Sequence, residues 1–109
     1  MNRNFAVMNI RLQKIEIKNP NLELFIKRED LIHPLISGNK FRKLKYNLLQ
    51  AKEENQTTLL TFGGAFSNHI LAVACAGFEH NFKTIGIIRG EELIDKINEN
   101  PTLKKAQEL

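Results

Sequence analysis

The residues best suited to chemistry lie where two predicted helices begin. In the first stretch, Gly38 and Lys40 open the strongest helical pattern in the chain. Gly38 permits a tight or left-handed backbone. Ser37 or Asn39 can cap the helix, which leaves Lys40 in the first turn. The positive end of a helix favours a neutral, nucleophilic amine over an ammonium group, so Lys40 is a candidate for Schiff-base chemistry with a carbonyl compound. A solvent-exposed surface lysine is the ordinary alternative.

The second stretch joins a predicted strand to the next helix. Gly63 and Gly64 allow close backbone approach, and Ser67, Asn68 and His69 offer a hydroxyl, an amide and a titratable ring. In open α/β sheets ligands bind at this edge, and the free amides of a helix start favour an anion. A plain turn with an ordinary N-cap and a surface histidine is the alternative. The stretch matches neither the phosphate-loop motif nor the dinucleotide-binding motif, and no acid is placed to complete a Ser-His-acid triad.

A hairpin precedes these stretches. Residues 11–18 alternate apolar and polar side chains, which predicts a half-buried strand. Asn19-Pro20-Asn21 is a turn signal, and residues 22–27 alternate again. Together they predict an antiparallel hairpin with a short loop.

Alternating helices and strands then carry the two stretches. The first helix is expected from Asn39 to about Asn55, with Phe41, Leu44, Leu48 and Ala51 on its apolar face. A strand over residues 57–62 leads to an almost uncharged, largely buried helix over residues 70–78. The continuous apolar run of residues 84–88 is typical of a parallel strand buried on both faces.

This order predicts an α/β fold with a parallel sheet and right-handed crossovers. Asn100 and Pro101 form a further helix start. Two buried strands need more sheet and more covering helices than 109 residues supply, so the chain is expected to be truncated at Leu109.

The amino-acid composition limits which classes of function fit this chain. The hydrophobic content of 42% is that of a globular protein. A net charge of +4 with 7% aromatic residues is weak support for nucleic-acid binding, so a basic binder built on the helix at residues 40–52 is a minor alternative. Cys75 lies in an apolar run and is expected to be a small buried hydrophobe. His33, His69 and His80 are isolated, so no metal site is predicted. The absence of signal-peptide and membrane-span patterns points to the cytoplasm.

Three stretches taken together resemble a known family. Residues 27–31 (KREDL), 37–44 (SGNKFRKL) and 67–69 (SNH) are similar to the 1-aminocyclopropane-1-carboxylate deaminase and D-cysteine desulfhydrase family. Its members depend on pyridoxal phosphate and have the tryptophan synthase β-subunit-like fold. Residues 1–9 show no clear period and are predicted to be a lead-in, and the resemblance begins at about Ile10. Residues 10–109 would be the N-terminal part of a larger three-layer pyridoxal-phosphate enzyme fold.

The resemblance also implies roles for individual residues. Lys40 matches the lysine that forms the Schiff base with the cofactor. Ser67 matches the serine beside the substrate carboxylate, which is implicated as a nucleophile in the deaminase branch. Asn68 matches the residue that hydrogen-bonds the cofactor's ring oxygen near the substrate carboxylate. His69 stands where the family carries Gln or His beside that carboxylate.

Two positions depart from the family pattern. Ser37 replaces a usual Gly, and Phe66 replaces a common Gln, changes that bear on substrate preference more than on cofactor attachment. The family's phosphate-binding loop is expected beyond Leu109, so the isolated chain is expected to bind the cofactor weakly and to be inactive. The implied activity is deamination or elimination on a small amino acid, by a full-length homodimer that binds neither nucleic acid nor membrane. The alternative is a non-catalytic α/β module that binds an anion at residues 63–69.

Overall fold

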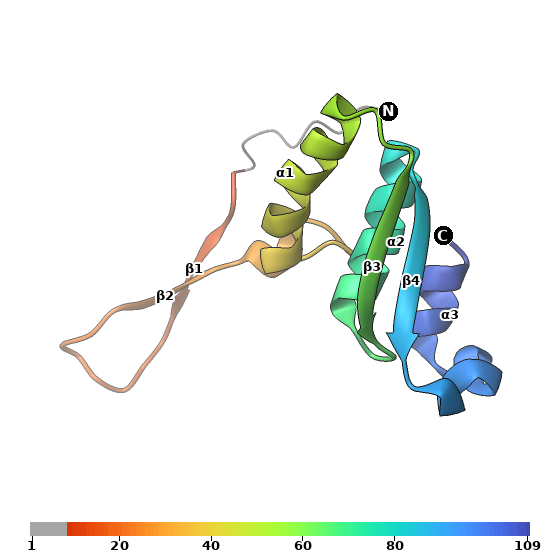
Figure 1. Cartoon of the computed structure of the whole chain (residues 1–109). Coiled ribbons are helices and arrows are strands. Elements are labelled where there is room, and N and C mark those ends of the chain that lie inside the picture. The colour runs from red at the N-terminus through yellow and green to blue at the C-terminus, as the bar shows by residue number, and fades with distance from the viewer. Residues whose placement is uncertain (1–8) are drawn as a thin grey trace.

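The computed structural model describes residues 9–109, and Figure 1 shows a two-stranded arm beside a body of helices and strands. The predicted lead-in, apart from Asn9, lies outside the described residues. The elements are β1 (Leu12–Ile15), β2 (Leu24–Lys27), η1 (Glu29–Leu31), α1 (Asn39–Glu53), β3 (Thr58–Gly64), α2 (Asn68–His80), β4 (Lys83–Arg89), η2 (Glu91–Glu99) and α3 (Pro101–Gln107).

The arm is the predicted antiparallel hairpin, with Leu12 opposite Lys27 and Ile15 opposite Leu24. The prediction that its strands are half-buried is wrong. Leu12 is 66% exposed and Phe25 50% exposed, because the arm projects from the body (Figure 1). The connection, residues 16–23, is also longer than a short loop. The projection explains a radius of gyration of 17.1 Å, against about 13 Å for a compact chain of this length.

Helix α1 follows the predicted pattern closely. Leu44 and Leu48 are buried, and Phe41 and Ala51 pack against the same core. The helix ends at Glu53. Asn55, two residues later, has a left-handed backbone with a φ of 54°. The backbone N–H of Gln56 donates to Ala51 O at 2.8 Å, which satisfies a terminal carbonyl. The predicted stop at Asn55 is confirmed.

Strands β3 and β4 pair in parallel, from Thr58 opposite Lys83 to Gly64 opposite Arg89. Helix α2 connects them and is buried along most of its length, with the core formed between α1 and α2. The predicted α/β architecture, an N-terminal hairpin followed by alternating helix and parallel strand, is confirmed.

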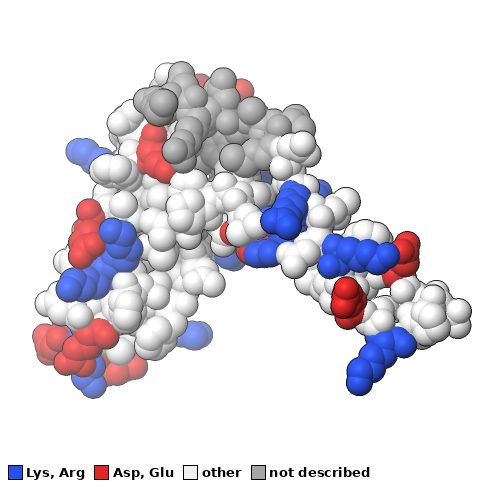
Figure 2. Space-filling view, turned by 180° about the vertical axis from the view of Figure 1, so that it is seen from behind, with Lys and Arg blue, Asp and Glu red and all other residues white. Residues whose placement is uncertain are grey.

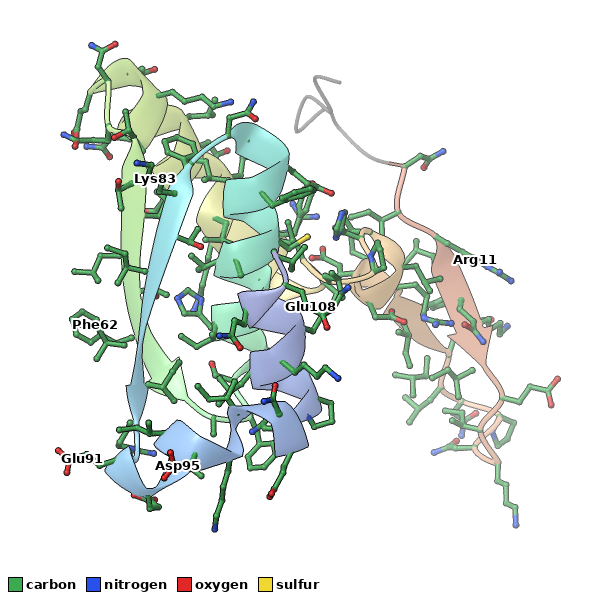
Figure 3. All side chains as sticks on the ribbon, turned by 90° about the vertical axis from the view of Figure 1, so that its right-hand side faces the viewer. Arg11, Phe62, Lys83, Glu91, Asp95 and Glu108 are labelled. Carbon is green, nitrogen blue, oxygen red and sulfur yellow. The ribbon has the colours of Figure 1, made fainter. Side chains whose placement is uncertain are left out.

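One face of this sheet differs from the prediction. Four apolar side chains, Leu60, Phe62, Ile85 and Ile87, are about half or more exposed. Figure 3 shows Phe62 on the side of β3 that faces away from α2. The strands are apolar on both faces, as predicted, but within residues 9–109 only the face toward α2 is covered. Burial on both faces is therefore not observed.

Beyond β4 the chain turns into α3. Asn100 caps this helix as predicted: its Oδ1 accepts from the N–H groups of Thr102 at 3.0 Å and Leu103 at 3.1 Å. The 3-10 segment η2 precedes α3 and follows Gly90, whose φ is 116°. None of the helices formed by residues 9–109 combines the length and apolar character needed to cross a bilayer.

Candidate functional site

The starts of α2 and α3 lie at the end of the molecule where β3 and β4 finish, and α1 runs in the same direction as α2, so that its start is turned toward this end (Figure 1). The side chain of Asn100 reinforces this arrangement, because its Nδ2 donates to Ala65 O at 3.0 Å, in the turn between β3 and α2. The carboxyl edge of a parallel sheet is the usual place for a ligand. The two stretches singled out from the sequence are both turned toward this end.

The start of α1 carries Lys40. The cap position belongs to Gly38, with φ 59° and ψ −135°, and no side chain caps the helix. The prediction that Ser37 or Asn39 supplies a cap is wrong, because the chain places the one residue without a side chain at that position. The predicted positive φ of Gly38 is confirmed. Lys40 lies in the first turn, half-buried.

Glu29, in the preceding 3-10 turn η1, stabilises the start of α1 through its backbone and its side chain. Its backbone carbonyl accepts from the N–H of Gly38 at 3.0 Å. Its carboxylate accepts from Arg42 Nε at 2.7 Å and from Arg42 Nη2 at 2.8 Å. The hydrogen bond from Arg42 lowers the pKa of the Glu29 carboxyl. One residue of the KRED turn therefore holds both the cap position and the first turns of α1.

His33 holds the loop before α1. The ring is buried, and its Nδ1 accepts from the N–H groups of Leu35 at 3.1 Å and Ile36 at 2.9 Å. Nε2 must therefore carry the proton, and it donates to Glu79 Oε1 at 2.9 Å. This contact to α2 corrects the expectation that His33 is isolated.

His33, Cys75 and Glu79 offer possible metal-ligand atoms within 4.8 Å of one another. A metal bound at Nε2 requires the ring proton to move to Nδ1. Nδ1 already accepts two backbone N–H groups and has no room for that proton. The cluster is better suited to holding a loop than to holding a metal. Cys75 is buried as predicted, and this burial raises the pKa of its thiol.

The start of α2 is capped by a side chain. Ser67 Oγ accepts from the N–H groups of His69 at 3.2 Å and Ile70 at 3.4 Å. Asn68 is the first helical residue, and it is exposed. Gly63 lets the helix approach β3 closely, since a Cβ there would lie 2.6 Å from Ile70 Cγ1.

His69 connects the two helix starts electrostatically. Burial lowers the pKa of its ring, and the charges of Lys40 and Lys43 on α1 lower it further. Its Nε2 lies 2.8 Å from Thr61 Oγ1 on β3. The charge of Lys40 thus reaches His69, and Ser67 and Asn68 lie beside His69 on the same turn. Within the described residues no hydrogen bond joins the Lys40 amine to Ser67 or Asn68.

Sequence reasoning gave no role to Thr61 or Lys43. Thr61 could have been found from the alternation of β3, where it takes an inward position among apolar residues. Lys43 lies outside the apolar face predicted for its helix, and only the packing of α1 beside α2 reveals that its charge reaches His69.

A cavity lies elsewhere in the molecule. Its volume is about 790 Å³, it is enclosed by β4, α2, η2 and α3, and its lining is mostly apolar, with Ile70, Val73, Ile88 and Leu103 among the contributors. Lys40, Ser67, Asn68 and His69 do not line it. We base the candidate site on the helix starts, because the cavity lacks their convergent polar groups.

Curated proteins provide an independent comparison. A bifunctional D-cysteine desulfhydrase/1-aminocyclopropane-1-carboxylate deaminase of Arabidopsis thaliana, named as mitochondrial, is 38% identical over 81 residues, 74% of this chain and 20% of its own length. A Thermotoga maritima protein provisionally named a 1-aminocyclopropane-1-carboxylate deaminase is 38% identical over 73 residues, 66% of this chain and 23% of its own. A D-cysteine desulfhydrase of Salmonella paratyphi A is 32% identical over 69 residues, 63% of this chain and 21% of its own.

The matched part of the chain belongs to the 1-aminocyclopropane-1-carboxylate deaminase and D-cysteine desulfhydrase family. The family resemblance seen in the sequence is confirmed. The chain spans between a fifth and a quarter of the length of these relatives. No family model matches the chain.

Proposed function

We propose that residues 10–109 supply the lysine-bearing part of a pyridoxal-phosphate enzyme that deaminates a small amino acid or eliminates a group from it. One observation carries the proposal: Lys40, at the start of α1, lies close enough to His69, at the start of α2, for its charge to lower the pKa of that ring. An amine from one stretch thus acts on a second stretch whose Ser67, Asn68 and His69 carry donors suited to a carboxylate, which supports the proposal. The names of the relatives support the same reaction class.

The residues present fit part of the cofactor. Lys40 is half-buried and, within residues 9–109, forms no ion pair, so its amine is available to a carbonyl group. Asn68 is exposed at the start of α2, with an amide that can hydrogen-bond an aromatic ring oxygen. Lys40 Nζ would hold the cofactor covalently and Asn68 would hold it by hydrogen bonding. When bound, pyridoxal phosphate supplies an electron sink for the substrate's α-carbon.

The start of α2 would bind the substrate carboxylate. Ser67 Oγ uses its acceptor capacity on two backbone N–H groups, which leaves the hydroxyl proton to be donated to an anion. The partial positive charge of the helix start favours the same anion. His69 adds a ring N–H donor. Once its amine is released, Lys40 would accept or carry a proton, and Ser67 would be the nucleophile if the reaction opens a ring.

The substrate class follows from the same site and from the relatives. Their names specify 1-aminocyclopropane-1-carboxylate and D-cysteine, which are both small amino acids. Assays of the polypeptide that carries this sequence at full length would separate the two reactions. Sulfide release from D-cysteine indicates elimination, and 2-oxo acid formation from 1-aminocyclopropane-1-carboxylate indicates ring-opening deamination. We further propose that the full-length protein is a homodimer.

Chemical labelling tests the assignment of Lys40. The protein is incubated with pyridoxal phosphate, reduced with borohydride and mapped by mass spectrometry. We expect the pyridoxyl group on Lys40 in clear excess over Lys45, a lysine of the same helix whose Nζ lies 5.4 Å from the Tyr46 ring centre. Lys40→Ala should remove most of the label, and Lys45→Ala should leave it. Equal labelling of both lysines would show that Lys40 is an ordinary surface amine.

A second candidate is a non-catalytic module that binds an anion at residues 63–69. The observation in its favour is that the charges of Lys40 and Lys43 both act on His69 beside a helix start. Perturbation of the His69 resonances by phosphate, without preferential labelling of Lys40, would favour this candidate over the enzyme.

A further inference from the structure

Thr61 contacts a residue of the proposed site and has no role in the function described above. Its Oγ1 lies 2.8 Å from His69 Nε2, and both side chains are half-buried. Thr61 occupies an inward position of β3, facing α2, while its neighbours Leu60 and Phe62 are exposed. A hydroxyl placed between a sheet and an apolar helix needs a hydrogen-bond partner, and the ring of His69 provides it.

The proton in this hydrogen bond can belong to either side chain. If Nε2–H donated to Thr61, the Thr61 hydroxyl proton would need another acceptor, and no hydrogen bond within residues 9–109 supplies one. If the hydroxyl donates to Nε2, its one donor is used. The ring proton then lies on Nδ1. The second arrangement uses the Thr61 donor and the Nε2 acceptor within the protein, and it leaves the Nδ1–H group to a ligand or to water.

The position of the ring proton matters because the ring is held neutral. Burial and the nearby charges of Lys40 and Lys43 all lower the pKa of His69, so the ring cannot rely on a positive charge to bind an anion. A neutral ring has a single N–H donor. Nδ1 makes no hydrogen bond to the described residues, so it is the nitrogen left for a ligand.

We propose that Thr61 is a positioning residue: its hydroxyl holds His69 as the Nδ1–H tautomer, so that the ring offers an N–H donor to the carboxylate of the substrate. The identity of the ligand rests on the proposed function. The tautomer itself does not, since it depends only on Thr61 and His69.

Nuclear magnetic resonance of the ring nitrogens of His69 tests the tautomer directly. At neutral pH we expect the wild-type ring proton on Nδ1 and an unprotonated Nε2. Thr61→Val removes the hydroxyl at nearly constant shape and should shift the population toward the Nε2–H tautomer. Thr61→Ser keeps the hydroxyl and should retain the wild-type pattern. A wild-type proton found on Nε2 overturns the proposal without recourse to any variant, and so does a Thr61→Val spectrum with an unchanged tautomer.

A carboxylate probe tests the consequence. Acetate should shift the Nδ1 resonance of the wild-type protein, and Thr61→Val should weaken this binding roughly three- to tenfold, as expected for one lost hydrogen bond. Equal acetate binding in the two proteins would contradict the positioning role. Labelling of Lys40 by pyridoxal phosphate should be unaffected in Thr61→Val. Loss of selective Lys40 labelling in the wild-type protein would refute the proposed function and leave the tautomer result standing.

Discussion

The starts of α1 and α2 are turned toward the same end of the molecule but are stabilised in different ways. Helix α1 begins at Gly38 with no side-chain cap, and its start depends on contacts to Glu29 and on a loop held by His33. Helix α2 begins at Ser67, whose own hydroxyl caps it. Lys40 takes no part in these contacts and forms no ion pair within residues 9–109, which leaves its amine available for chemistry. Ser67 combines a structural role with a proposed binding role.

Acidic and basic side chains are interspersed on the face shown in Figure 2. In the start of α1 the charges are paired, since Arg42 binds Glu29 and Arg28 binds Asp30. Lys40 and Lys43 have no such acidic partner within residues 9–109. The charges of Lys40 and Lys43 therefore produce a positive electrostatic potential at His69. Five predictions test this contrast between the two helix starts.

The largest effect is expected at His33. His33→Ala removes a buried ring and leaves the N–H groups of Leu35 and Ile36 without their acceptor. We expect a loss of about 3 kcal/mol in the free energy of unfolding, measured by urea denaturation. Glu79→Gln keeps an acceptor for the ring N–H and should cost less than about 1 kcal/mol. Equal losses for the two variants would mean that the backbone bonds to Nδ1 are unimportant.

Gly38 should give the next largest effect. Gly38→Ala places a Cβ at φ 59°, where nothing collides but the backbone conformation is strained. The expected cost is about 2 kcal/mol. Gly64→Ala is the matched control, since a Cβ there also meets open space and the φ is not positive. It should change the free energy of unfolding by less than about 0.5 kcal/mol. A Gly38→Ala protein as stable as the control would show that the start of α1 can relax.

The caps themselves provide the third test. Ser67→Ala removes the acceptor for two backbone N–H groups and should cost about 1 kcal/mol. Ser37→Ala and Asn39→Ala should each stay within about 0.5 kcal/mol, because neither side chain caps α1. Denaturation of the three variants under one condition makes the comparison. A loss at Asn39 as large as that at Ser67 would remove the distinction between the helix starts.

Features fixed by neighbouring residues were predictable from the sequence. The left-handed Gly38, the stop at Asn55 and the cap at Asn100 each follow from local backbone chemistry. The parallel pairing of β3 and β4 follows from the order of elements, since a helix between two strands requires a crossover. The placement of Lys40 at one helix start and His69 at another was predictable in the same way.

Features that depend on distant contacts were not predictable. His33 and Glu79 are 46 positions apart, and no local pattern links them. The exposure of Leu12 and Leu60 depends on whether another element covers them, and an apolar strand pattern alone does not determine that. The roles of Lys40, Ser67, Asn68 and His69 in binding and catalysis stay predictions.

The smallest effect concerns the positive electrostatic potential at His69. Lys43→Ala removes one of the two charges that oppose protonation of the ring, so the pKa of His69 should rise. The rise should be partial, because burial is the largest cause of the lowered pKa and remains in the variant. Titration of the His69 ring resonances measures it, with Lys45→Ala as a control on the same helix. An unchanged pKa in Lys43→Ala would place that charge too far from the ring to matter.

The same shift has a consequence for stability. Because the folded-state pKa of His69 lies below its ordinary value of 6.5, the unfolded chain takes up the proton first as the pH falls. The contribution of His69 to the free energy of unfolding is therefore fully present above about pH 6.5. It declines on acidification until the folded ring also protonates. His80, whose pKa is lowered chiefly by burial, contributes in the same direction. His69→Gln should make the decline between pH 7 and pH 5 shallower, and Lys43→Ala should do so by less. An identical decline in all three proteins would assign the pH dependence to His80 and to the carboxylates. It would also show that the charge of Lys43 on α1 does not affect His69 at the start of α2.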